Sequence, residues 1–434
     1  MRTVLVVVPD YASHWLPMAS LAADWVRGGD RVVVATGPVI GERARTAGYE
    51  VIDLVLGPAS NPGLARVEAQ PADEAERLAG FFAATSRGAV ETLLYQADER
   101  RHDLLWSPDV VATRMAQVLA EVDPDVVLAD HLGFGATLAL RALQRPYATV
   151  APGHPSSVPA GDEIYGLPPA WPVALAPPAD QLQRLRTRSV EVTREFTAAY
   201  NAALTTLEPR AEPVHDAFAA TGAAVFHLYP RAMIEHPVPG RVYVGSAGRR
   251  EALPDDLASL LDRPATGPTA YVSLGTFLSV RADVLGLLVG GLRASGARVL
   301  LATGAADPGR LPELPAGSIA RPTLPQVGLL NRCDLCLTHG GNNTVTEALS
   351  AGVPLVVAPL STDQFAVAAD VERCGLGAVV DPNASSAQQV AAAVAVALRP
   401  DVQARAAALG RRLRGDPGPA QVRRELQVLS ARSG

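Results

Sequence analysis

The stretch Thr338-His339-Gly340-Gly341-Asn342-Asn343-Thr344-Val345-Thr346-Glu347-Ala348 carries the strongest signal in this sequence. It follows an apolar run typical of a buried strand, and its own pattern predicts the start of a helix. Small glycines let backbone amides approach a ligand, and the start of a helix attracts anions. Asn343 and Thr344 would donate to phosphate oxygens, and Glu347, one turn later, would accept from a ribose diol. The alternative is a plain strand–helix turn.

Further apolar runs alternate with helical patterns along the chain, which is typical of βαβ units in a doubly wound parallel sheet. The predicted strands of the first half are Thr3–Val8, Arg31–Thr36, Tyr49–Leu54, Val126–Ala129 and Tyr147–Val150. Those of the second half are Tyr271–Ser273, Val299–Ala302, Leu335–Thr338, Leu355–Ala358 and Ala378–Val380. The sequence therefore predicts an α/β protein with two doubly wound, Rossmann-like domains.

Two segments interrupt this alternation. Residues 151–180 contain eight prolines and predict a long loop beside a binding site. A stretch rich in Pro, Gly and Arg predicts a linker at 246–265. We therefore divide the chain into an N-terminal domain, the linker, a C-terminal domain and a final helix, at 1–245, 246–265, 266–416 and 417–434.

The composition excludes several classes of protein. With 434 residues, a net charge of −6 and three cysteines, the chain is neither a disulfide scaffold nor a basic nucleic-acid binder. No run reaches the roughly 18 apolar residues of a membrane span, and the N-terminal run is too short for a signal peptide. We expect a cytoplasmic protein of unknown oligomeric state. All 38 basic Lys and Arg positions are arginine, so no phosphate-binding lysine is possible.

Three flanking motifs extend the signal around His339: Leu324-Pro325-Gln326-Val327-Gly328-Leu329-Leu330, Ala351-Gly352-Val353-Pro354-Leu355 and Pro359-Leu360-Ser361-Thr362-Asp363-Gln364-Phe365. With them the sequence resembles the nucleotide-sugar-dependent glycosyltransferases of family 1, which have the GT-B fold and include plant secondary-product and bacterial antibiotic enzymes. The resemblance spans the chain and is densest over Pro325–Gln364. It implies two domains facing across a cleft, with the final helix crossing back to the first.

The resemblance also implies a donor site. His339 would contact the diphosphate, Asn343 and Thr344 the phosphates, and Glu347 the ribose, while Asp363 and Gln364 would bind sugar hydroxyls. The other donor residues that it implies are Ser273, Gly275, Thr276, Pro325, Gln326, Gly341 and Asn342. Thr323 stands where the plant enzymes have a tryptophan that stacks on uracil, so UDP and dTDP both remain possible. No other cofactor is expected.

On the acceptor side, His14 follows the first strand, where open α/β sheets bind ligands, and His14 with Pro17 matches the family's Gly-His-x-x-Pro pattern except at Ser13. The family places its general base here, so the resemblance makes His14 the base and Asp130, at the end of another strand, its partner. Asp130 would fix the tautomer and stabilise the imidazolium. An isolated histidine and a helix-capping aspartate are the alternatives.

Apolar and aromatic residues in the region 81–106 and the 151–180 loop suggest a lipophilic acceptor, such as a macrolide, polyketide or aromatic aglycone. The acceptor-binding residues that we predict are Tyr11, Phe81, Trp106, His154 and Tyr165. An ordinary core role is the alternative for these side chains. No metal-binding residue is predicted, because Cys333 and Cys336 have no second pair and fit packed free thiols better.

The resemblance therefore implies an inverting glycosyltransferase that moves a hexose or deoxyhexose from a UDP- or dTDP-sugar to a small lipophilic acceptor. Two alternatives stay open. One is an enzyme similar to nucleotide-sugar 2-epimerases, and the other is a helper protein that keeps the fold without the chemistry.

Overall fold

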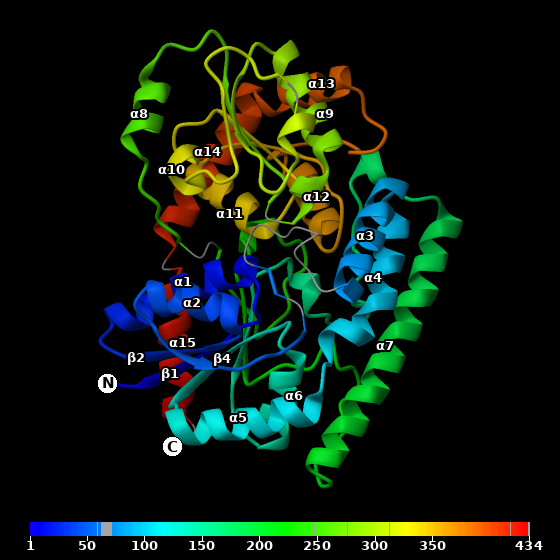
Figure 1. The fold of residues 1–434 in the computed structure, drawn as a ribbon, viewed down its shortest axis with the longest axis vertical. Helices are drawn as coiled ribbons and strands as arrows, with labels where there is room; N and C mark the ends of the chain where they lie inside the picture. Colours follow the sequence, from blue (N-terminus) through cyan, green and yellow to red (C-terminus); the bar gives the residue numbers. More distant parts are fainter. Residues whose placement is uncertain are drawn as a thin grey trace.

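The computed structural model describes residues 1–58, 60–61, 72–245, 248–275, 277–311, 313–416 and 418–432, so the predicted donor residue Thr276 lies outside the described residues. Two parallel sheets form the centres of two α/β domains (Figure 1). The first sheet has the order β3-β2-β1-β4-β5-β6-β7. Its strands are β1 Thr3–Val7, β2 Arg31–Thr36, β3 Glu50–Asp53, β4 Val126–Asp130, β5 Ala148–Ala151, β6 Ala224–His227 and β7 Val242–Tyr243.

The second sheet has the order β10-β9-β8-β11-β12-β13, again parallel throughout. Its strands are β8 Thr269–Ser273, β9 Arg298–Ala302, β10 Ile319–Arg321, β11 Leu335–Thr338, β12 Leu355–Val357 and β13 Gly377–Val379. The predicted fold class, two doubly wound α/β domains, is confirmed. The strands β6, β7 and β10 were not predicted, and all three are short.

Helices connect the strands in both domains. Those between the strands of the first sheet, or following them, are α1 Ala12–Arg27, α2 Pro38–Thr46, α3 Ala72–Arg87, α4 Ala89–Leu104, α5 Pro108–Val122, α6 Phe134–Ala142 and α7 Ala179–Leu207. The later helices are α8 Asp255–Asp262, α9 Ala282–Ala294, α10 Gln326–Leu330, α11 Asn342–Ala351, α12 Gln364–Arg373, α13 Ala387–Ala397, α14 Pro400–Gly415 and α15 Pro419–Arg432. No helix within these described ranges has both the length and the apolar character needed to cross a membrane.

The strand β1 is buried on both faces, as its unbroken apolar run predicts. Val4 and Val6 enter one hydrophobic cluster, and Leu5 and Val7 enter the cluster on the opposite face of the sheet. All four side chains are fully buried. This two-sided burial fixes the position at which β1 ends and α1 begins.

Each sheet reverses its strand order next to its first strand. β1 pairs with both β2 and β4, and β8 pairs with both β9 and β11. Connections on the two sides of such a point leave the sheet in opposite directions, so ligands bind at the carboxyl ends of those strands. The fold therefore offers two equivalent positions for a site, one after β1 and β4 and one after β8 and β11.

The chain ends on the first domain. Val422 and Leu426 of α15 join the same hydrophobic cluster as Trp25 of α1, and Arg423 Nε donates to Asp24 Oδ2 at 3.0 Å. Figure 1 shows α15 running down beside α1, away from α14. The segment 246–265 is more than a connector, because it contains α8, whose Leu257 is buried in a cluster of the second domain.

The donor-side helix α11 packs closely on α14 through glycine. A Cβ atom on Gly410 would lie 2.8 Å from the backbone of Gly352 and from Leu349 O. We therefore expect Gly410→Ala to destabilise the second domain by about 1–3 kcal/mol, since the backbones must move apart. Thermal unfolding measures this as a lower midpoint. Gly415→Ala is the matched control in α14, because its Cβ would meet nothing within 4 Å. Equal midpoints for the two variants would contradict this packing.

Candidate active site

The carboxyl ends of β1 and β4 bring a histidine and an aspartate together. Val7 of β1 pairs with Ala129 of β4, so Asp130 ends its strand beside the turn into α1. His14 lies in the first turn of α1, and its Nδ1 is 2.8 Å from Asp130 Oδ2. The Asp130 side chain is fully buried, whereas 16% of the His14 side chain is exposed. A substrate can therefore reach the imidazole but not the carboxylate.

Asp130 is held from more than one direction. Its Oδ1 accepts a hydrogen bond from the backbone N–H of Leu132 at 2.9 Å and lies 3.4 Å from His131 Nδ1. Burial by itself would raise the pKa of Asp130, but the interactions with His14 and His131 outweigh it and hold the pKa well below its ordinary value. Asp130 is therefore an anion at neutral pH.

An ionised carboxylate can only accept hydrogen bonds, so His14 donates from Nδ1 and keeps Nε2 as its basic nitrogen. Burial acts to lower the pKa of His14, while the charge and hydrogen bond of Asp130, with a further contribution from Asp363, raise it above 6.5. The net effect is an upward shift of the His14 pKa, which makes Nε2 a stronger base. Such an imidazole accepts a proton readily and has a partner that stabilises its charge.

The second site position lies after β8 and β11. Thr338 of β11 pairs with Ser273 of β8, and His339 follows directly. Gly275 allows the close approach of this histidine, since a Cβ at Gly275 would lie 2.7 Å from His339 Cε1. Burial lowers the pKa of His339 to about 4, so this imidazole is neutral at neutral pH. Gly340, at φ 88°, and Gly341, which caps α11, complete the turn.

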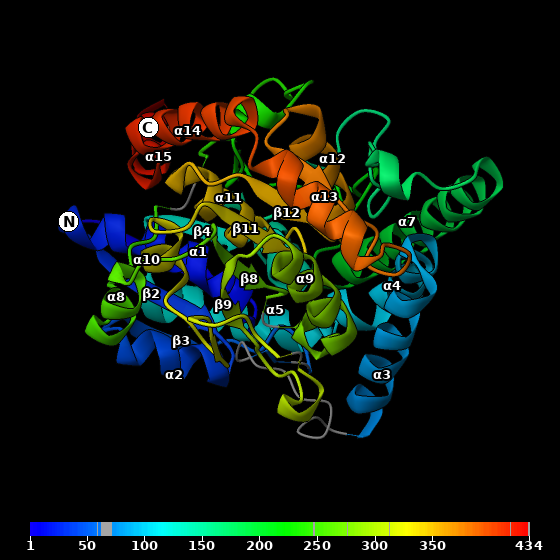
Figure 2. The ribbon, with the colours of Figure 1, turned by 90° about the horizontal axis from the view of Figure 1, so that it is seen from above.

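The first two side chains of α11 bond to the backbone of the first domain. Asn342 Nδ2 donates to Pro152 O at 2.7 Å and to Leu228 O at 2.9 Å. Asn343 Nδ2 donates to Ser13 O at 2.8 Å. Both views place α11 beside the start of α1 (Figure 1 and Figure 2). The predicted phosphate-binding turn and the turn that carries His14 are therefore directly joined.

Pro17 explains why the Ser13 carbonyl can accept this bond. In a helix the carbonyl of residue 13 would accept from the N–H of residue 17, but proline has no N–H. Pro17 lies inside α1, four residues after Ser13. Pro17 thus leaves the Ser13 carbonyl without its helical donor, and Asn343 of the other domain donates to this carbonyl instead.

Glu347 lies one turn further along α11, and its carboxylate accepts three hydrogen bonds. Arg249 donates to it twice, from Nε to Oε1 at 2.8 Å and from Nη2 to Oε2 at 2.9 Å. Gln326 Nε2 also donates to Oε2, at 2.5 Å, and Thr344 Oγ1 lies 3.3 Å from Gln326 Oε1. The structure thus brings the predicted donor residues Gln326, Thr344 and Glu347 together beside Pro325, which caps α10.

The turn before α12 carries the predicted sugar-binding pair. Thr362 has φ 51°, a strained value for a β-branched residue, and its N–H donates to Gln96 Oε1 of α4. Asp363 Oδ2 accepts from the backbone N–H of His154 at 2.6 Å. Gln364 Oε1 accepts from the N–H groups of residues 360 and 361, so it stabilises the turn itself.

The five predicted acceptor residues lie in different surroundings. The ring of Tyr11 is 6.1 Å from that of His14. His154 is buried and lies 3.3 Å from Asp370 through its Nε2. Tyr165 stacks on Phe218 at 4.1 Å, and Trp106 is half-buried.

Phe81 is buried in a cluster of the second domain, where it packs with Phe277 at 5.3 Å. Its ring therefore helps hold the two domains together. An acceptor contact for any of these five side chains stays a prediction.

Two further groups of polar side chains stand out among the described residues. His14, Asp130 and His131 offer nitrogen and oxygen atoms within 4.8 Å of one another, and such ligand atoms could also hold a cation.

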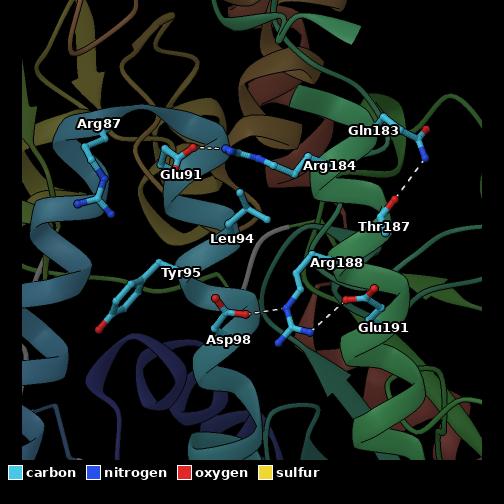
Figure 3. Close-up of a pocket in the computed structure, with 10 residues that line it drawn as sticks. All are labelled: Arg87, Glu91, Leu94, Tyr95, Asp98, Gln183, Arg184, Thr187, Arg188 and Glu191. Carbon is cyan, nitrogen blue, oxygen red and sulfur yellow. Dashed lines mark hydrogen bonds and ion pairs between the residues drawn. The ribbon is translucent and has the colours of Figure 1, made fainter. Parts of the chain in front are cut away.

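The pocket in Figure 3 lies between α4 and α7 and includes no predicted site residue. Its charged lining is largely paired, as in Arg188–Asp98 at 2.7 Å. Cys333 and Cys336 are free thiols.

Sequence reasoning missed Arg249 and the contacts between domains. Arg249 belongs to no motif, and it lies 98 residues from Glu347. The Asn343–Ser13 bond joins residues 330 positions apart. Only the missing N–H of Pro17 gave a local signal for it.

Comparisons with known proteins agree with this fold. A model of the family described as "UDP-glucoronosyl and UDP-glucosyl transferase" matches residues 191–408, half of the chain. The chain is 34% identical over 140 residues to the NDP-glycosyltransferase YjiC of Bacillus subtilis, covering 31% of this chain and 36% of that protein. It is 33% identical over 178 residues to the vancomycin aglycone glucosyltransferase of Amycolatopsis orientalis, covering 41% and 43%. The aligned part covers about a third of the length of YjiC from Bacillus subtilis and of two other curated relatives.

Solved structures are similar over the whole chain. The spinosyn forosaminyltransferase SpnP has a TM-score of 0.68 at 19% identity and covers 99% of both chains. The glycosyltransferase VinC in complex with dTDP has a TM-score of 0.64 at 18% identity and covers 99% of this chain and 100% of that one. At these identities the likeness shows the fold alone, which is the GT-B arrangement of two Rossmann-like domains.

The titration of His14 tests the geometry of the pair directly. We expect a midpoint above pH 6.5 in the wild type and below 6.5 in Asp130→Asn, because burial then acts without the opposing charge. NMR of histidines labelled at Cε1 measures both midpoints, and His14→Gln identifies the resonance. A midpoint that does not fall in Asp130→Asn would contradict the assigned coupling.

Proposed function

Because the chain belongs to the UDP-glucoronosyl and UDP-glucosyl transferase family, we propose that it transfers a hexose or deoxyhexose from a UDP- or dTDP-sugar to a hydroxyl of a small lipophilic natural product. The observation that carries this proposal is the His14–Asp130 pair, whose turn is bonded to the helix that would hold the donor phosphates. A base and a phosphate site in direct contact suit a reaction between two bound substrates.

The reaction would proceed as a direct displacement. As the acceptor oxygen attacks the anomeric carbon, its proton moves to His14 Nε2. The bond from that carbon to the diphosphate oxygen breaks, and the electron pair leaves with the nucleoside diphosphate. Attack opposite the leaving group inverts the anomeric configuration. Asp130 stabilises the imidazolium that forms, because it is a buried anion 2.8 Å from Nδ1.

On the donor side, the start of α11 would stabilise the leaving diphosphate. Backbone N–H groups at a helix start are fixed donors that need no rearrangement as charge develops. His339, which is neutral, would add a ring N–H, and Asn343 and Thr344 would add side-chain donors. Glu347 would accept from the ribose hydroxyls, while Asp363 and Gln364 would orient the sugar.

Relatives support the class of substrates. The names of two relatives describe transfer to natural products: vancomycin aglycone glucosyltransferase, and demethyllactenocin mycarosyltransferase from Streptomyces fradiae, to which 66% of this chain aligns at 27% identity. VinC binds dTDP, which supports a dTDP-sugar as one donor candidate. The acceptor that we propose is accordingly a macrolide, polyketide or aromatic aglycone.

A screen of donors and acceptors tests this function. UDP, dTDP and GDP are compared by thermal shift, and the sugars of the stabilising nucleotide are then incubated with an aglycone panel. We expect a glycoside whose anomeric configuration is opposite to that of the donor, as measured by NMR of the first-formed product. Sugar turnover without acceptor would instead indicate an epimerase, and binding without turnover would indicate a helper protein.

The role of His14 is tested by substitution. His14→Ala is expected to lower kcat by about 10²–10⁴-fold, the usual contribution of a general base. The wild-type rate should fall as pH decreases through the raised pKa of His14, because protonation removes the base. His215→Ala is the control, since His215 is exposed and far from these motifs in sequence. A wild-type rate in His14→Ala would contradict the assignment.

A further inference from the structure

Arg249 binds the carboxylate of Glu347, which in the proposed function accepts hydrogen bonds from the ribose. Its guanidinium makes two parallel hydrogen bonds to Glu347, and the two side chains are only 19% and 10% exposed. Such bidentate pairs are among the stronger polar contacts in proteins. Arg249 reaches Glu347 from the segment that joins the two domains, between β7 and α8.

Ribose binding and this ion pair compete for the same acceptor sites. A carboxylate offers about four lone-pair positions. Arg249 takes two of them, and Gln326 Nε2 takes a third. A ribose diol brings two more donors, which exceeds what remains. A nucleotide that places its ribose on Glu347 must therefore displace at least one of these three donors, and two of the three belong to Arg249.

The donor residues otherwise lack positive charge. Those assigned from sequence are neutral or acidic, with carboxylates at Glu347 and Asp363, and burial keeps His339 neutral by lowering its pKa to about 4. The ligand brings a diphosphate, which is a multiple anion, and the chain contains no lysine to meet it. Glu347 follows Asn343 by one helical turn, roughly 6 Å along the axis. A change in the side-chain conformation of Arg249 would therefore be enough to bring its guanidinium from Glu347 to the phosphates that we assign to Asn343.

We propose that Arg249 is a donor-binding residue that holds Glu347 between turnovers and moves to the diphosphate when the ribose takes the carboxylate. This inference rests on the proposed function of the same site. A nucleoside that breaks the Arg249–Glu347 pair offers Arg249 no new anion. A nucleoside diphosphate breaks the same pair and supplies one. Arg249 would therefore make the site select nucleotides that carry the diphosphate.

Calorimetry with four ligands tests the proposal: uridine, thymidine, UDP and dTDP. We expect Arg249→Met to weaken binding of the preferred diphosphate by about tenfold or more, the effect of losing a charged hydrogen bond. Its affinity for the matching nucleoside should stay equal or increase, because Glu347 is released. Arg249→Lys should retain most of the preference for the diphosphate, since the charge remains. Arg250→Met is the matched control, as Arg250 is the exposed neighbour.

The change in nucleoside affinity, compared with the change in diphosphate affinity, shows whether Arg249 binds the diphosphate or only shapes the pocket. If Arg249→Met weakened both ligands by the same factor, Arg249 would only shape the pocket, and the proposal would be overturned. An unchanged affinity for the diphosphate would overturn it equally. A wild-type protein that binds neither UDP nor dTDP would instead refute the proposed function, and this inference with it.

Discussion

The parallel pairing of β1 with β4 and of β8 with β11 is the constraint on which both halves of the site depend. In each sheet these strands flank the point where the strand order reverses, which is where open α/β sheets bind ligands. The first pair places His14 beside Asp130, and the second places Ser273 beside His339. His14 and the turn that carries His339 thus occupy equivalent positions in two similar domains.

Contacts between the domains use the same side chains that the proposed function needs for the donor. Asn342, Asn343 and Asp363 each bond to backbone groups of the first domain. Pro17 takes part indirectly, because its missing N–H leaves the Ser13 carbonyl open to Asn343. In the proposed function, the amide NH2 of Asn343 would serve both the Ser13 carbonyl and the donor phosphate, since it carries two donors.

The sequence predicted the elements that rest on local signals. Unbroken apolar runs such as Val4–Val8 predicted the central strands, and the family resemblance implied the pairing of His14 with Asp130. Of the four edge strands, β7 and β10 escaped prediction because they are short and partly exposed.

Long-range pairing explains the other omissions. Arg249 gains its role only from a partner on α11, and no periodicity marks such a pair. The acceptor contact of Phe81 stays a prediction, and the burial of its ring against Phe277 was not foreseen, because it depends on how α3 meets the second domain. Local pattern reports which face of an element is apolar, but it does not report which element covers that face.

In the proposed function, the turn that carries His14 and the start of α11 act as one unit through the Asn343–Ser13 bond. A double-mutant cycle of Pro17→Ala and Asn343→Ala on kcat/KM measures this coupling. The Pro17→Ala substitution would supply the missing N–H to the Ser13 carbonyl, so Asn343→Ala should cost less in that background than in the wild type. We predict a coupling of about 0.5–1.5 kcal/mol, the usual worth of one hydrogen bond, or roughly a two- to twelvefold smaller effect. Effects that multiply independently would contradict the claim.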